Sequence, residues 1–227
     1  MAEVFDCSDS SRLLAAARAA RQALGQGRLI VLPTDTVYGI AADAFTPEAV
    51  ERLLAAKGRG RQSPPPVLIA DTATLGALAA EVPEAVRVLA ERFWPGALTI
   101  VLTANPGLSW DLGDTGGTVA IRMPEDPIAL ELLEECGPLA VSSANLTGRP
   151  AAITIDDARD MLGNTVAVYL DGGMSRTGVA STIVDATGLT AGGGRPVAVL
   201  REGAVTRSAL RGVLGDLLEP DPGTVDA

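Results

Sequence analysis

Short apolar runs alternate with segments of helical periodicity along the chain. The run from Leu29 to Leu32 is short and rich in aliphatic side chains, which predicts a buried strand. Pro33 cannot donate a hydrogen bond to a neighbouring strand, so the strand is expected to end there. Thr46 followed by Pro47 is a typical helix start, and a helix is expected to follow it. The same criteria predict strands at 67–70, 98–102, 118–121, 139–141, 167–170, 181–185 and 197–200, and helices at 10–24, 75–80, 83–92, 127–136, 156–162 and 206–218.

Because strands and helices are mixed along the whole chain, the pattern predicts an α/β fold with one twisted, mixed β-sheet flanked by helices. The 227 residues contain no repeat or long low-complexity segment, and we expect residues 1–218 to form a single domain. Residues 219–227 are expected to be a disordered tail. Residues 104–117 are polar and glycine-rich, so they are expected to form a loop, and this loop is a candidate flap.

Targeting signals are missing from the sequence. No apolar stretch approaches the ~20 residues that a membrane-spanning helix needs. The first residues include Glu3 and Asp6 and are acidic, where a secretion signal would be basic. Two cysteines, Cys7 and Cys136, are too few for a disulfide framework or a zinc cluster. The sequence therefore predicts a cytoplasmic protein that does not associate with a membrane.

Polar motifs recur where the apolar strands end. Thr34 and Thr36 follow the first strand, Arg122 follows the strand at 118–121, and Ser143 and Asn145 follow the strand at 139–141. Loops at strand ends are where open α/β sheets bind their ligands. Each motif also fits a structural role when taken alone: a tight turn for the threonines, a surface ion pair for the arginine, and a helix cap for the serine. Spacing alone leaves both interpretations open.

Lys57 is the only lysine among the 18 basic residues of the chain. A lysine that persists against a background of arginine suggests a task that arginine cannot perform. A compact ammonium group makes a point contact with a phosphate oxygen, where a planar guanidinium is too large. The alternative is an ordinary surface lysine whose aliphatic stem packs on the protein.

The composition excludes several kinds of chemistry. The chain has no histidine, which rules out a Ser-His-Asp or Cys-His hydrolase, a histidine general base and a histidine-ligated metal. A net charge of -10 argues against non-specific nucleic-acid binding, which needs a basic face. An aromatic content of 3% leaves few side chains for base stacking. Any catalysis must therefore rest on Lys and Arg charges, hydroxyls, carboxylates and backbone amides.

Six short segments, in this order, resemble the signature of the threonylcarbamoyl-AMP synthase family, the YrdC-domain proteins. Each segment is weakly specific alone, and their order makes the resemblance strong. The segments are PTDTVYG at 33–39, KGR at 57–59, VAIRMP at 119–124, SANLTG at 143–148, STIVD at 181–185 and LREG at 200–203.

The resemblance implies a fold and a reaction. The fold is a single YrdC-like α/β domain with a large concave groove. The reaction is that of an L-threonylcarbamoyladenylate synthase, a nucleotidyltransferase that makes threonylcarbamoyl-AMP and diphosphate from ATP, L-threonine and bicarbonate or CO2. The product would serve the threonylcarbamoyladenosine modification of tRNA by a separate transferase complex, so weak or no direct tRNA binding is expected. Mg²⁺ is expected to accompany ATP, with no protein side chain assigned as its ligand.

The resemblance also implies site residues. Lys57 and Arg59 are the candidate catalytic residues, because they would hold the charge of the triphosphate. Asp35 is not assigned to a substrate, because an extra carboxylate beside ATP repels it unless the carboxylate holds a metal or orients a donor. The candidate ATP-binding residues are Lys57, Arg59, Ser63, Thr118, Ser143, Asn145 and Arg201, and the candidate threonine-binding residues are Thr34, Thr36, Arg122, Ser142 and Ser181.

The sequence departs from the family pattern at one position of the expected site. Leu68 stands where many family members have a histidine. Arg61, in the preceding loop, is the candidate to replace the lost polar contact. Longer family members also carry a C-terminal domain, for which this chain is too short.

Two other functions remain as alternatives. One is an RNA-binding module without adenylation activity, against which the acidic charge and low aromatic content argue. The other is a carbamoyl-adenylate-forming module like that of hydrogenase maturation proteins. Diphosphate release that requires both threonine and bicarbonate distinguishes the synthase from both.

Overall fold

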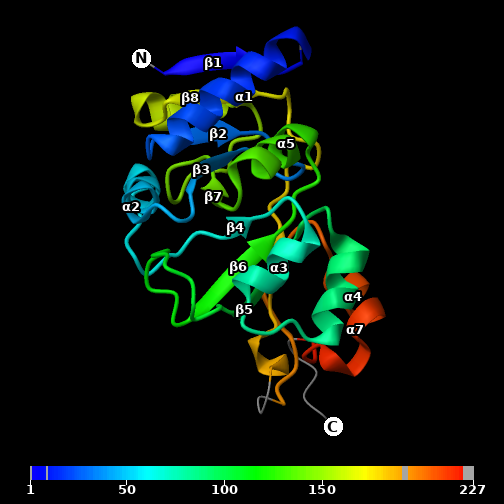
Figure 1. Ribbon diagram of the computed structural model, residues 1–227. Coiled ribbons are helices and arrows are strands. Elements are labelled where there is room, and N and C mark those ends of the chain that lie inside the picture. Colours follow the sequence, from blue (N-terminus) through cyan, green and yellow to red (C-terminus); the bar gives the residue numbers. More distant parts are fainter. Residues whose placement is uncertain (1, 9, 191–193, 222–227) are drawn as a thin grey trace.

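The structure of the protein, a computed structural model, describes residues 2–8, 10–190 and 194–221. Within these residues ten strands form one mixed sheet (Figure 1). The strands are β1 (Glu3–Asp6), β2 (Ile30–Leu32), β3 (Gly39–Asp43), β4 (Val67–Leu68), β5 (Leu98–Thr103), β6 (Thr118–Arg122), β7 (Leu139–Ser143), β8 (Val168–Asp171), β9 (Thr182–Asp185) and β10 (Ala198–Arg201).

The spatial order of the strands is β1-β8-β2-β3-β7-β4-β6-β5-β9-β10. Strand β8 pairs parallel with β1 and β2, β4 pairs parallel with β6, and β5 pairs parallel with β9. The remaining neighbours are antiparallel, including β9 and β10. The prediction of a mixed sheet is confirmed.

Helices cover the sheet differently in its two halves. Figure 1 shows α1 and α5 over the upper strands and α3 over the lower ones, with α4 and α7 beside them. The α-helices are α1 (Ser10–Gly25), α2 (Pro47–Ala56), α3 (Thr72–Leu78), α4 (Glu84–Phe93), α5 (Pro127–Cys136), α6 (Ile155–Leu162) and α7 (Arg207–Leu214), and the short 3₁₀ helices are η1 (Gly163–Thr165), η2 (Thr187–Leu189) and η3 (Gly215–Leu217).

The half of the sheet from β1 to β7 has a hydrophobic core on each face. Successive residues of a strand point to opposite faces. Ile30 of β2 therefore enters the core under α1 and α5, while Val31 enters the core under α2 and α6. Both side chains are fully buried. This half of the sheet is a rigid three-layer block.

The other half has a continuous core on one face only. In β5, Leu98 and Ile100 point into the core with α3, α4 and α7, whereas Thr99 and Val101 point to the opposite face. Strand β6 alternates in the same way, so Thr118 shares a face with Thr99. This second face carries no helix layer, and it forms the floor of a cavity.

The observed elements differ from the predicted ones at several places. The sheet contains two strands that were not predicted, β1 and β3. Helix α2 begins at Pro47 as expected, but the Thr46 hydroxyl donates to Asp43 instead of capping the helix. The last helix was expected to run to residue 218; α7 ends at Leu214, and η3 follows it.

The chain beyond residue 218 remains attached to the domain. A side-chain oxygen of Glu219 accepts hydrogen bonds from Val199 N and Arg207 Nη2, both at 2.9 Å. Asp221 lies 3.3 Å from Arg211 Nη2. The ordered domain therefore reaches past the expected limit at residue 218, and residues 222–227 of the expected tail lie outside the described residues. Within the described part of the chain, no helix is long and apolar enough to cross a bilayer.

Candidate functional site

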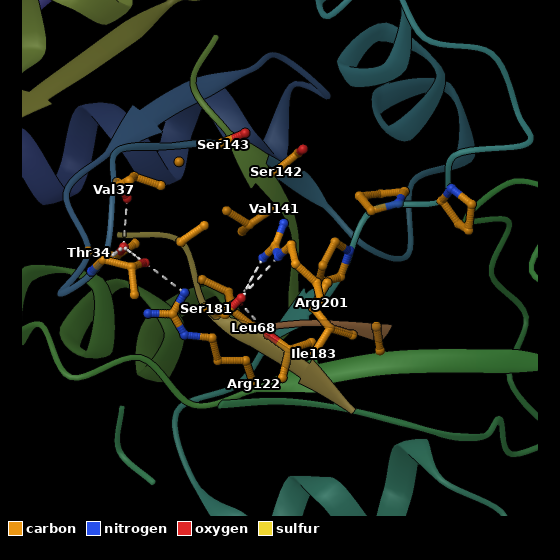
Figure 2. A pocket seen from close by; sticks show the side chains of 18 of the residues that line it. Thr34, Val37, Leu68, Arg122, Val141, Ser142, Ser143, Ser181, Ile183 and Arg201 are labelled. Atoms are coloured by element: carbon orange, nitrogen blue, oxygen red, sulfur yellow. Dashed lines mark hydrogen bonds between the residues drawn. The ribbon is translucent and has the colours of Figure 1, made fainter. Parts of the chain in front are cut away.

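A cavity of about 550 Å³ opens on the uncovered face of β5, β6 and β9 (Figure 2). Its other walls come from the turn after β2, the loop that leads into β4, the loop after β7, and strand β10. These segments are far apart in the sequence, and the mixed strand order brings them together. The cavity is lined by ten of the predicted site residues: Thr34, Thr36, Arg59, Thr118, Arg122, Ser142, Ser143, Asn145, Ser181 and Arg201.

The turn after β2 forms a buried hydroxyl pocket. The Thr34 hydroxyl donates to the Val37 carbonyl oxygen at 2.6 Å and lies 3.0 Å from the Thr36 hydroxyl. The turn is anchored by Tyr38, whose hydroxyl donates to Gly173 O. These contacts fix both threonine side chains in the cavity wall, and each is less than 5% exposed.

Arg122 is buried beside this pocket and is held from three directions. Its Nη2 donates to Asp35 Oδ1 at 2.5 Å, Nη1 to Thr36 Oγ1 at 2.9 Å, and Nε to Gly96 O at 2.9 Å. Burial lowers the pKa of Arg122, and the Asp35 charge opposes that shift. Asp35 is therefore the counter-ion that orients Arg122, which is one of the two roles that the sequence left open for it. A guanidinium offers five N–H groups, so one hydrogen remains on each terminal nitrogen.

Lys57 lies behind the cavity wall and is 1% exposed. It follows the last residue of α2. Its Nζ donates to the main-chain oxygens of Ser143 and Asn145, the second at 2.8 Å, and lies 3.3 Å from Asn145 Oδ1. These acceptors account for the three hydrogens of an ammonium group. Burial, followed by the charge of Arg59, lowers the pKa of Lys57 to about 7.

This placement contradicts the surface interpretation of Lys57, because the residue is buried and its ammonium group faces the loop after β7. The main-chain oxygen of Lys57 also accepts hydrogen bonds from the amide and hydroxyl of Thr147, at 3.1 and 2.8 Å. Lys57 therefore fastens the 143–147 loop to the end of α2, and so fixes the position of Ser143 and Asn145.

Arg59 and Arg201 carry positive charge on the cavity surface. Arg59 Nε donates to Thr147 Oγ1 at 3.1 Å, and Arg201 donates to the main-chain oxygen of Ser181. Within the described residues neither arginine pairs with a carboxylate. Burial and then the charge of Arg59 lower the pKa of Arg201. The charge of Arg201 in turn lowers the pKa of Arg122, so Arg201 is the member of this row of three cations that interacts with both Arg59 and Arg122, and Asp35 is the counter-ion of Arg122.

Two predicted contacts are not found at the cavity. Ser63 does not line it, and its amide donates to Gly60 O at 3.1 Å within a turn. Arg61, the candidate to replace the family histidine, is exposed and binds Asp111 with both terminal nitrogens, at 3.0 and 2.8 Å. The cavity wall at Leu68 is instead apolar, because Val141 and Ile183 line it as well (Figure 2).

The Arg61 ion pair ties the candidate flap to the loop before β4. Asp114 N also donates to Arg61 O at 2.8 Å, and Trp110 stacks on Phe45 with ring centroids 5.5 Å apart. Leu112 lines the cavity. The 104–117 loop thus forms part of the cavity rim.

The sequence reasoning missed one buried polar residue of the site. Thr99 is 1% exposed and lines the cavity, with its hydroxyl 2.8 Å from the Ser181 hydroxyl. Successive side chains of a strand point to opposite faces, so a polar residue between Leu98 and Ile100 lies on the face of β5 away from the core. This alternation in the sequence could have identified Thr99 as a candidate site residue.

The described residues hold no group of three or more Cys, Asp or Glu side chains with the spacing of a metal site. The residues that line the cavity include no Asp or Glu. The site is therefore one of fixed cations and hydroxyls, suited to binding anions.

Comparison with known proteins places this geometry among related chains. The Sua5/yciO/yrdC family model, described as "Telomere recombination", matches residues 22–203. A Mycobacterium leprae protein provisionally named threonylcarbamoyl-AMP synthase is 50% identical over 215 residues, which cover 95% of each chain. The Bacillus subtilis threonylcarbamoyl-AMP synthase is 39% identical over 196 residues, covering 86% of this chain and 55% of that protein.

A solved structure agrees with these relatives. The crystal structure of Pyrococcus abyssi Sua5 complexed with L-threonine superposes with a TM-score of 0.83 at 34% identity. The match covers 96% of this chain and 62% of that chain. The longer protein therefore contains the whole fold described above together with further residues.

Proposed function

The chain belongs to the Sua5/YciO/YrdC family, and we propose that it is an L-threonylcarbamoyladenylate synthase. It would form threonylcarbamoyl-AMP and diphosphate from ATP, L-threonine and bicarbonate. The observation that carries this proposal is the row of three cavity arginines with one counter-ion among them. The reaction brings together two anionic reactants, a triphosphate and a carbamate. The arginine row can bind one reactant at its Arg59 end and the other at its Arg122 end.

Threonine is proposed to bind at the Arg122 end. A carboxylate can accept the two hydrogens that remain on the terminal nitrogens of Arg122, because a guanidinium presents them in one plane. The Ser142 hydroxyl lies 3.5 Å from Arg59 Nη1, and the Ser181 hydroxyl lies beside Arg201. Thr34 and Thr36 lie at the Arg122 end, where Arg122 Nη1 donates to the Thr36 hydroxyl. They offer hydrogen-bond partners to the amino group and to the threonine hydroxyl.

ATP is proposed to bind at the Arg59 end. Arg59 would contact the phosphates, and Thr118, Ser143 and Asn145 would orient the nucleotide. Lys57 acts as a positioning residue in this proposal, because it holds the loop that carries Ser143 and Asn145. Ser63 lies outside the cavity lining and is not part of the proposed site.

The residues suit a direct displacement. The amino group of threonine first becomes a carbamate, and a carbamate oxygen then attacks the α-phosphorus of ATP in line while diphosphate leaves. No covalent bond to the protein forms, so no histidine or activated nucleophile is required. The chain contributes positioning and fixed positive charge where negative charge develops.

Mg²⁺ is proposed to enter with ATP. Mg²⁺ keeps several waters and commonly uses substrate phosphates together with one or two carboxylates. The cavity-lining side chains do not supply carboxylates, so they do not fit a protein-held Mg²⁺. The arginines of this chain would therefore neutralise phosphate oxygens that the ion leaves free.

The product is proposed to pass to a separate transferase complex that modifies tRNA. The net charge of -10 opposes tight tRNA binding by this chain itself. Of the described cavity-lining residues, Tyr38 is the one aromatic side chain, and it is fully buried. The cavity thus offers no stacking platform for bases, which disfavours the RNA-binding alternative.

The test is diphosphate release by the purified protein from ATP, with each other substrate omitted in turn. We expect release only when L-threonine and bicarbonate are both present. Carbamoyl phosphate in place of both serves as the control for the carbamoyl-adenylate alternative. Release with carbamoyl phosphate, or release without threonine, would contradict the proposal.

A further inference from the structure

Arg61 connects the loop between α2 and β4 to the loop between β5 and β6. Its Nη1 and Nη2 donate to the two carboxylate oxygens of Asp111 at 3.0 and 2.8 Å, and its Nε donates to Asp114 Oδ1 at 3.4 Å. An isolated ion pair on the surface contributes little, but a bidentate arginine that also meets a second carboxylate has the geometry of an effective one. This network is therefore expected to hold the two loops together.

The main chains of the two loops also meet at this point. Asp114 N donates to Arg61 O at 2.8 Å. Gly113 has a φ of +102°, and a Cβ atom there would lie 2.6 Å from Arg61 O. A side chain at this position would clash with the main chain, so the close approach of the loops requires a glycine. Asp111 Oδ1 also accepts a hydrogen bond from Gly113 N at 3.0 Å, so the carboxylate that binds Arg61 shapes the same turn.

The segment that Arg61 holds carries residues of the cavity wall. Leu112, next to Asp111, is 3% exposed and lines the cavity together with Thr115 and Thr118. The hydroxyl and the amide of Thr118 both donate to Thr115 O, at 2.8 and 3.2 Å. The position of Thr118 therefore depends on the turn that Arg61 fixes.

Arg61 also lies in the loop that carries Arg59. Only Gly60 separates the two arginines, and the prolines at 64–66 follow in the same loop. Arg59 and these prolines line the cavity, whereas Arg61 does not. Arg61 is thus placed to act on a ligand through the residues on either side of it, without touching the ligand itself.

We propose that Arg61 is a positioning residue for ATP, which acts by holding the 111–115 segment against the loop that carries Arg59. With this link in place, Thr118 and Arg59 keep the spacing that the nucleotide requires. Without it, the 111–115 segment can move out of the cavity wall, and the contacts of Thr118 with the nucleotide weaken. The inference rests on the proposed function, in which ATP binds at the Arg59 end.

The experiment measures ATP affinity by calorimetry in Arg61→Gln, in Asp111→Asn and in the variant with both changes. Each single change is expected to weaken ATP binding about 5-fold, the upper end of what an exposed ion pair contributes. The double variant should lose no more than either single variant, because the two side chains act as one unit. The asparagine keeps an oxygen for Gly113 N, so the turn itself is retained. In diphosphate release, the ATP requirement should rise by the same factor, while the rate at saturation and the threonine requirement stay unchanged.

Arg21→Gln is the matched control. Arg21 pairs with Glu135 between α1 and α5, and the exposed fractions of these side chains, 56% and 36%, are close to the 55% and 43% of Arg61 and Asp111. Neither Arg21 nor Glu135 lines the cavity, so ATP binding should equal that of the wild-type protein. Amide hydrogen exchange in the 111–115 segment should become faster in Arg61→Gln and in Asp111→Asn, and should stay unchanged in the control.

Several results would overturn the positioning role. If Arg61→Gln weakens ATP binding while Asp111→Asn leaves it unchanged or strengthens it, Arg61 contacts the phosphates directly. If neither change affects ATP binding, the link is a surface ion pair without influence on the site. If the two losses add in the double variant, the side chains do not act through each other.

Failure of the proposed function would be recognised separately. A wild-type protein that binds ATP but releases no diphosphate with threonine and bicarbonate would refute the synthase activity, and the ATP affinities of the variants would still decide the role of Arg61. A wild-type protein that does not bind ATP would refute both.

Discussion

Diphosphate release is expected to fall by about 100-fold when Lys57 is replaced by arginine, the scale of a small misplacement of binding groups. The ammonium group is enclosed between Ser143 and Asn145 and is 1% exposed, so a larger planar head cannot donate to the same acceptors. The 143–147 loop must then move, and it carries two of the proposed ATP-binding side chains. Overpacking at a buried position is also expected to lower the free energy of unfolding, by ~1–3 kcal/mol.

The measurement is the steady-state rate of diphosphate release, with ATP and threonine varied separately. We expect a loss of rate and of ATP affinity, and threonine binding close to that of the wild-type protein. The converse exchange at an exposed position, Arg18→Lys on α1, is the matched control and should be neutral. Full activity in Lys57→Arg would contradict the role of Lys57 as the residue that positions this loop.

Replacing Arg122 with methionine is expected to cost ~3–5 kcal/mol of unfolding free energy, because Asp35 would remain buried without its counter-ion. Threonine affinity should fall at least ~10- to 100-fold through loss of the carboxylate partner. Urea unfolding reports the first effect and calorimetry the second. The two effects can be separated, since only one of them depends on Asp35.

The double variant Asp35→Asn, Arg122→Met makes that separation. Removing both charges should restore most of the unfolding free energy, because no uncompensated ion remains. Threonine binding should stay weak in the double variant. If threonine affinity recovers together with stability, Arg122 is a structural residue and does not contact the substrate.

Much of the fold could be predicted because the apolar pattern is regular. The predicted strands at 98–102 and 139–141 are confirmed as the cores of β5 and β7. Strand β3 was missed because its sequence, Gly39–Asp43, contains glycine and two alanines, which have little preference for strands. It is a strand because β2 and β7 pair with it on either side. This pairing is a tertiary interaction, so the local sequence of β3 does not reveal it.

The site could be predicted as a set of motifs, but the direction of each side chain could not. Asn145 and Arg122 line the cavity as predicted, whereas Lys57 is not among the lining residues and donates to the loop that carries Ser143 and Asn145. A lysine at a helix end has acceptors within reach on several sides, and the folded position of the 143–147 loop decides among them. The partner of Arg122 was missed for the same reason, since Asp35 lies 87 residues away in the sequence.

The most direct test of the proposed synthase activity is the identity of the nucleotide product. The protein is incubated with ATP, L-threonine and ¹³C-labelled bicarbonate, and the products are analysed by mass spectrometry. The proposed function predicts an adenylate whose mass equals AMP plus a threonylcarbamoyl group that carries one ¹³C atom. The formation of ADP, or of AMP without a labelled threonylcarbamoyl group, would contradict it.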